Sequence, residues 1–187
     1  MQTTANAVLI GSHAARRLIP WRETADWDLY ADAAYFDKLQ NHPSWRTLRT
    51  GRNKLLGMLD RKRIDCTLIR RTSWTHWIME ASRSGEAFSL APDVPCVCAS
   101  PSTLMVIQDV LSHWPRNWQK HTLDYLHLKR AFPGVQYSAM EHQAWQTGMA
   151  TFSREFPKAR PLRRRGVRNE LLEMVLAEME NPTVPLP

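Results

Sequence analysis

The sequence predicts an α/β (α+β) protein, with strands and helices to about residue 99 and helices alone after that. A nearly continuous apolar run at 5–10 stops at Gly11-Ser12, which is typical of a strand buried on both faces. From Pro101 onward the chain turns helical. We therefore expect residues 1–99 to form an α/β core and residues 100–187 to form an α-helical region packed on it.

The first elements follow from their end signals. Ser12 is a good N-cap for a short helix at 13–19, which Pro20 ends. A second strand is expected at 27–31, opening with Asp26-Trp27-Asp28, and Asp32 caps a helix at 33–40. The further predicted strands are 45–50, 54–59, 63–69 and 94–99, and the further predicted helices are 74–82, 101–113, 118–131, 138–156 and 167–180.

Length and composition fit a globular domain with an anionic partner. The 187 residues are 43% hydrophobic and carry a formal charge of +7, which suits nucleotides or nucleic acids, although good solubility alone also explains such a charge. No apolar run approaches the roughly 20 residues that span a bilayer. The N-terminal residues lack a signal peptide pattern, so we expect a cytoplasmic protein without a membrane partner. Cys66, Cys96 and Cys98 are expected to be packed thiols rather than disulfides or metal ligands.

The pair Asp26 and Asp28 is the main chemical signal. Strand residues two apart point to the same face, so two carboxylates project side by side. Like charges at this spacing raise each other's pKa unless a cation lies between them, and a hard divalent ion is suited to that position. Taken alone, an Asp-x-Asp pair is more often part of a turn or a helix cap.

The wider pattern resembles the nucleotidyltransferase superfamily of the DNA-polymerase-β type. It consists of Gly11-Ser12 after the first strand, Asp26 and Asp28 on the second, and Asp65 on a later strand. The resemblance implies a mixed sheet flanked by helices and a two-metal mechanism with Mg2+ (or Mn2+) held by the three aspartates. Gly11 and the N–H groups after Ser12 would bind nucleotide phosphates. The loop at 21–25 makes the motif longer than the family pattern.

The helical half resembles small nucleotidyltransferase-like proteins that are frequent in phages. Its matching residues are Ser112, His113, Arg116, Asn117, Lys120, His121 and Asp124. Arg116, Lys120 and His121 would then form a basic wall that binds the triphosphate or an acceptor phosphate. A solvated helix face explains the same residues equally well. A metal site from His121, Asp124 and His127 is less favoured, and the short R-x4-H pattern of a helical ribonuclease family is a minor alternative.

A basic run at 160–168 offers a second polyanion contact, through Arg163, Arg164, Arg165 and Arg168. A solvated loop is the usual explanation for such a run. Trp21, Trp27, Trp45 and Trp145 could each stack on a base, although tryptophan is more often buried in a core.

The sequence thus predicts an enzyme that transfers a nucleoside monophosphate from an NTP to a hydroxyl or phosphate acceptor. The acceptor is a small molecule, a protein or an RNA or DNA end, and the sequence does not specify the oligomeric state. The first alternative is a nucleotide phosphohydrolase that uses the same metal site with water as acceptor. The second is a catalytically silent member of the fold that binds nucleic acid or a host protein.

Overall fold

A computed structural model describes residues 6–20, 25–115 and 117–156. These residues form one seven-stranded sheet in the order β3-β4-β5-β2-β1-β7-β6. The strands are β1 (Ala7–Ile10), β2 (Asp26–Ala31), β3 (Trp45–Gly51), β4 (Lys54–Leu59), β5 (Lys62–Leu68), β6 (Ala87–Ala91) and β7 (Val94–Cys98). The sheet is mixed, because β2 pairs with β5 and β1 with β7 in parallel, while the other neighbours are antiparallel.

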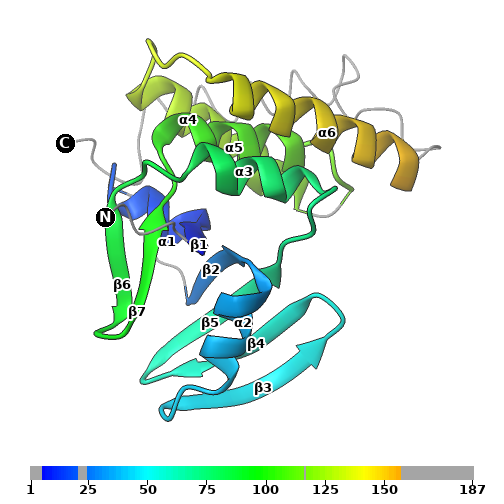
Figure 1. Cartoon of the computed structure of the whole chain (residues 1–187). Helices are drawn as coiled ribbons and strands as arrows, with labels where there is room; N and C mark the ends of the chain where they lie inside the picture. Colours follow the sequence, from blue (N-terminus) through cyan, green and yellow to red (C-terminus); the bar gives the residue numbers. More distant parts are fainter. Residues whose placement is uncertain (1–5, 21–24, 116, 157–187) are drawn as a thin grey trace.

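The helices lie on the two faces of this sheet. They are α1 (Gly11–Arg16), α2 (Ala33–Gln40), α3 (Trp74–Ala81), α4 (Pro101–Leu111), α5 (Trp118–Ala131) and α6 (Ala139–Glu155). Figure 1 shows α3 to α6 gathered as one layer above β1 and β2, with α2 at the opposite end beside β3 to β5. The predicted α/β (α+β) class, with a mixed sheet and a following helical region, is confirmed.

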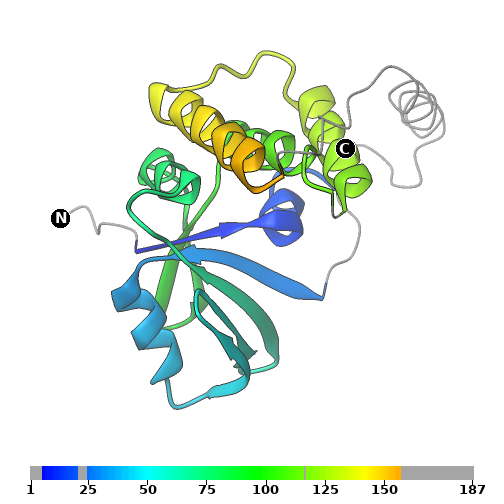
Figure 2. The ribbon, with the colours of Figure 1, turned by 90° about the vertical axis from the view of Figure 1, so that its right-hand side faces the viewer.

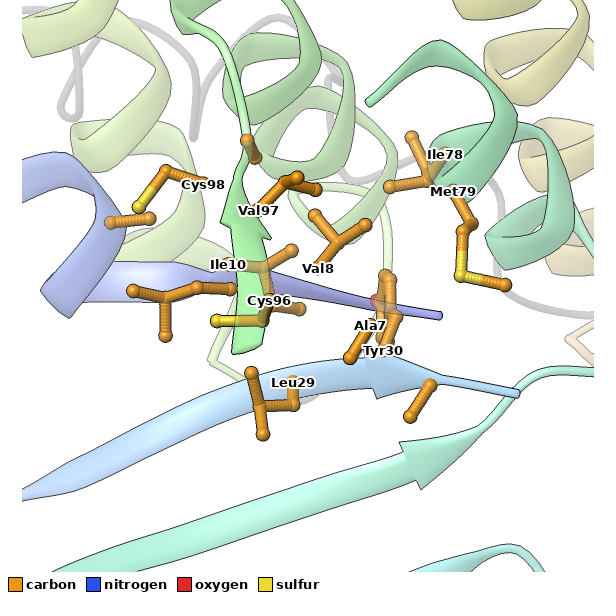
Figure 3. Close-up of a cluster of buried hydrophobic side chains, with 14 of the residues drawn as sticks. Ala7, Val8, Ile10, Leu29, Tyr30, Ile78, Met79, Cys96, Val97 and Cys98 are labelled. Atoms are coloured by element: carbon orange, nitrogen blue, oxygen red, sulfur yellow. The ribbon is translucent and has the colours of Figure 1, made fainter. Parts of the chain in front are cut away.

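The core covers both faces of the sheet, and it includes buried residues of α2 as well as those beneath the helical layer. Figure 3 shows side chains of β1, β2, β7 and α3 in one cluster, in which Val8 and Ile78 are fully buried. The three cysteines are free and buried, as predicted, and burial raises the pKa of the Cys66 thiol to about 12. In the described ranges, none of the helices combines the length and the apolarity that a bilayer crossing requires.

The structure corrects some predicted elements. Ser12 is not an N-cap: α1 begins at Gly11, Ile10 takes the N-cap position without a side-chain cap, and Ser12 is buried inside the helix. The reason is that Gly11, with φ of +68°, turns the chain directly from β1 into the helix. Strand β6 was not predicted, and it pairs with β7 alone in the sheet order. The predicted helix at 167–180 lies outside the described residues.

Candidate active site

The three predicted carboxylates lie on adjacent strands at one face of the sheet. Asp28 of β2 is directly opposite Asp65 of β5 in the parallel register, and Asp26 is opposite Arg63. Paired residues on neighbouring strands share a face, and Asp26 and Asp28 share it because they are two apart. We call this side of the sheet the carboxylate face.

Gly11 is interlocked with Asp28. A Cβ atom at Gly11 would lie 2.4 Å from Asp28 Oδ2 and 3.2 Å from both Cβ and Cγ of Asp28. The carboxylate of Asp28 therefore occupies the space that any other residue at position 11 would fill. The glycine that the sequence indicated for phosphate approach has a second, structural reason, which is to admit Asp28 to the end of β1.

Asp28 is the electrostatic centre of the site. Burial and the nearby carboxylates of Asp65 and Asp26 raise the pKa of Asp28 to about 6, against the opposing effect of Lys120 and Lys54. Lys120 belongs to α5 and Lys54 to β4, so positive charge acts on this carboxylate from two different elements. This arrangement suits a carboxylate that lies close both to a bound cation and to the oxygens of an anionic ligand.

Two ion pairs hold the outer carboxylates. Lys54 Nζ lies 3.0 Å and 3.2 Å from the two carboxylate oxygens of Asp65. Arg63 Nε lies 3.0 Å from Asp26 Oδ1. The sequence did not indicate either cation. The strand register would have indicated Arg63 as the partner of Asp26, because these two residues lie opposite each other. It would not have indicated Lys54 as the partner of Asp65, because Lys54 lies opposite Thr67.

The chemistry of the donors fits a hard divalent cation. All three side chains offer carboxylate oxygens, and burial together with repulsion from Asp65 and Asp26 raises the pKa of Asp28. As the side chains stand, no group of three or more His, Cys, Asp or Glu residues in the described ranges is close enough to hold a metal. A bound ion would compete with Lys54 and Arg63, which are paired with Asp65 and Asp26.

The other predicted site residues differ in their contacts and in whether the structure describes them. Lys120 acts electrostatically on Asp28. His121 Nδ1 instead donates to Gln108 Oε1 at 2.7 Å, and Ser12 is only 4% exposed. His113 is buried, with its ring 6.0 Å from that of Phe152. Arg116, Arg163, Arg164, Arg165 and Arg168 lie outside the described residues.

Trp27 braces the opposite side of β2. Its ring stacks on His13 at 4.0 Å and on Phe88 at 5.6 Å, and Lys62 Nζ lies 5.8 Å from its centre. Because Trp27 lies between the two aspartates in sequence, its side chain points away from them. The described contacts give Trp27 a structural role, fixing the strand that carries Asp26 and Asp28.

Neither of the other two described tryptophans that the sequence singled out lies at the carboxylates. The ring of Trp45 fills the space beside Gly57, where an added Cβ would lie 2.1 Å from it. Trp145 of α6 donates through Nε1 to Asp109 Oδ2 of α4, at 2.7 Å. Trp21 lies outside the described residues.

Comparison with known proteins gives structural likeness alone. No family model and no curated protein matches the chain. A solved antigenic nucleotidyltransferase-like protein from Paracoccidioides brasiliensis is similar at 16% identity, over 81% of this chain and 80% of that one, with a TM-score of 0.48.

The antibiotic-resistance factor ANT(2'')-Ia is similar in two structures. Its solution structure is 13% identical, over 95% of this chain and 87% of that one, with a TM-score of 0.31. Its crystal structure in complex with adenylyl-2''-tobramycin is 11% identical, over 95% and 88%, with a TM-score of 0.33. At these identities and TM-scores, the chemistry of the site has to be read from its own residues.

Proposed function

We propose that this protein is a metal-dependent nucleotidyltransferase, which transfers a nucleoside monophosphate from an NTP to a hydroxyl or phosphate acceptor. The observation that carries the proposal is Asp28, which lies opposite Asp65 in the sheet register and has its pKa raised by burial, Asp65 and Asp26. Three carboxylates on one face, with Lys54 and Lys120 acting from two sides, suit a phosphoryl centre.

The proposed roles follow from the contacts of each residue. Asp26, Asp28 and Asp65 would hold Mg2+ (or Mn2+), which supplies positive charge to the phosphate oxygens of the transferred group. Lys120 would bind a phosphate of the nucleotide as a point charge. Because His121 is bonded to Gln108 and Ser12 is buried, we assign these two residues to positioning rather than to direct phosphate contact.

Asp65 is suited to receive the proton of an acceptor hydroxyl. Its two oxygens accept from Lys54 Nζ, which holds the carboxylate in place on β5. In the transfer, the acceptor oxygen forms a bond to the α-phosphorus, the bond from that phosphorus to the pyrophosphate oxygen breaks, and the hydroxyl proton passes to Asp65. With water as acceptor, the same steps give hydrolysis.

One observation favours a second candidate, a silent member of the fold. Asp65 and Asp26 are each held by a cation of the protein itself, at distances of 3.0 Å. If Lys54 and Arg63 never release them, the site binds anions without a metal. Nucleotide binding that is equal with and without magnesium would identify this case.

The experiment is a thermal-shift titration of the full chain with NTPs, with and without Mg2+. Saturation to about 100 times Kd stabilises the native state by about 2.7 kcal/mol, which is a rise in Tm of roughly 5–10 °C for a chain of this size. The Asp28→Asn variant should lose the magnesium-dependent part of the shift. Asp37→Asn is the matched control, because Asp37 is exposed on α2. Transfer and hydrolysis are then separated by following an α-phosphate label into acceptor or free monophosphate.

A further inference from the structure

A large positive charge lies in the segment 45–71, which contains strands β3 to β5, their turns and the residues that follow β5. Residues 45–71 contain nine Lys and Arg against two Asp, a net charge of +7, which equals the formal charge of the whole protein. The remaining residues are therefore neutral as a set, with sixteen basic and sixteen acidic side chains. Within the described residues, this segment is a basic surface that suits an anionic partner.

A β-bulge aligns the arginines of β3 with the carboxylate face. Arg46 pairs with Met58 and Arg49 pairs with Leu56, although the two arginines are three residues apart. In a regular strand they would point to opposite faces, and the irregularity between Thr47 and Arg49 brings them to one. Bulges of this kind re-aim side chains beside functional sites.

The register then continues row by row to the aspartates. Met58 pairs with Arg63 and Leu56 with Asp65, and these in turn pair with Asp26 and Asp28. The buried residues of β4 are Leu55, Gly57 and Leu59, on the other face. Arg46 and Arg49 are thus the outer, exposed margin of the carboxylate face, three strands away from Asp26 and Asp28.

A hollow connects Arg49, at this margin, with Asp65. It has a volume of about 450 Å³, and it is lined by Arg49, Gly51, Arg52, Asn53, Lys54, Leu56 and Asp65. In Figure 2, α2 lies on one side of β3 to β5, and the layer of α3 to α6 lies towards β1 and β2. Figure 1 shows the same separation, so the outer strands extend beyond the helical layer.

We propose that the basic row formed by Arg46, Arg49, Arg52 and Lys54 binds the phosphate backbone of a single-stranded nucleic acid, whose terminal hydroxyl is the acceptor at Asp65. This acceptor class rests on the proposed nucleotidyl transfer. Strand β3 has seven residues, or about 23 Å at 3.3 Å per residue, which exceeds the length of one triphosphate and suits a polymer of phosphates. Arginine adds bidentate phosphate contacts. The donor nucleotide would lie on the α5 side, towards Lys120.

The test is fluorescence anisotropy with a labelled oligouridylate and a labelled oligothymidylate of about twelve nucleotides, within the range of single-strand site sizes. Four phosphate contacts give a salt slope of about −2.8, or roughly fifty-fold weaker binding at 200 mM than at 50 mM salt. The double variant Arg46→Gln/Arg49→Gln should lower the slope by about 1.4 and weaken binding by one to two orders of magnitude at low salt. The RNA and DNA probes show which sugar the acceptor carries.

The controls test whether binding depends on the position of the arginines, on their charge and on correct folding. Arg154→Gln removes an exposed arginine of α6 and should bind as wild type, and Arg46→Lys/Arg49→Lys should keep most of the affinity. Unchanged thermal melts show that the variants fold. Equal binding by the wild type and the double glutamine variant, or equal competition by polyglutamate of the same charge, would overturn the proposal.

Failure of the acceptor proposal and failure of the proposed function give different results. If the protein binds NTP in a magnesium-dependent way but binds no oligonucleotide, the nucleic-acid acceptor is rejected and the proposed transferase activity is retained. If oligonucleotide binding depends on Arg46 and Arg49 but neither NTP binding nor label transfer is detected, the nucleic-acid-binding surface is supported and the proposed transferase activity is rejected. Asp28→Asn should abolish label transfer onto the oligonucleotide and leave its binding unchanged.

Discussion

Replacing Gly11 with alanine tests the interlock between the β1–α1 turn and the central aspartate. Gly11 has φ of +68°, a conformation that costs a residue with a side chain about 1–2 kcal/mol. The new Cβ would also lie 2.4 Å from Asp28 Oδ2, so the carboxylate must leave its rotamer, at a further cost of about 0.5–1.5 kcal/mol. We therefore expect Gly11→Ala to lower the free energy of unfolding by roughly 2–3 kcal/mol.

Urea unfolding measures this loss, with Gly134→Ala as the matched control. A Cβ at Gly134 meets nothing within 4 Å, so the control should change stability by less than about 1 kcal/mol. In the Asp28→Ala background the obstructing oxygen is gone and only the Cβ of residue 28 remains, at 3.2 Å, so the cost of Gly11→Ala should fall towards its backbone part. An identical cost in both backgrounds, or no cost at all, would refute the interlock.

Three further predictions address the charges of the protein. Because the pKa of Asp28 is raised to about 6 in the folded chain, the free energy of unfolding should fall as the pH rises from about 4 to 6. Asp28→Asn should remove that slope and raise the free energy of unfolding by about 1–3 kcal/mol at pH 7 without magnesium. Parallel pH profiles of the variant and the wild type would contradict this prediction. Glu141→Gln should cost about 1–3 kcal/mol in urea unfolding, because the buried carboxylate accepts from the Thr103 hydroxyl and completes a capping box, and unchanged stability would disprove this role. Lys54→Met should strengthen Mg2+ binding several-fold in calorimetry at pH 8, since Asp65 loses its competing cation; weaker binding would mean that Lys54 helps to build the site.

Patterns with strong local causes were predicted well. The Ser100-Pro101 start of α4 is such a case: its hydroxyl accepts from the Thr103 N–H, as an N-cap should. Helix α5 has the predicted bounds, and the three strands of the β3–β5 ribbon lie within one or two residues of prediction. Turns and caps are encoded by neighbours in sequence, so a single sequence contains them.

Features that depend on the assembled sheet could not be predicted. The pairing of Asp65 with Asp28 requires the parallel register of β5 on β2, which no local signal gives. The ion pair between Lys54 and Asp65 follows only once β4 lies beside β5. Likewise, the bulge in β3 decides which way Arg46 and Arg49 point, and the sequence of that strand shows no glycine there to indicate it.

Calorimetric titration of the full chain with an NTP analogue that resists α-phosphate transfer tests the central claim most directly. The claim is that Asp26, Asp28 and Asp65 form a metal-dependent nucleotide site. The account predicts binding that strengthens at least tenfold with Mg2+ and loses this gain in Asp28→Asn, while Asp37→Asn behaves as wild type. Binding that is indifferent to magnesium, or a magnesium effect that persists in Asp28→Asn, would contradict it.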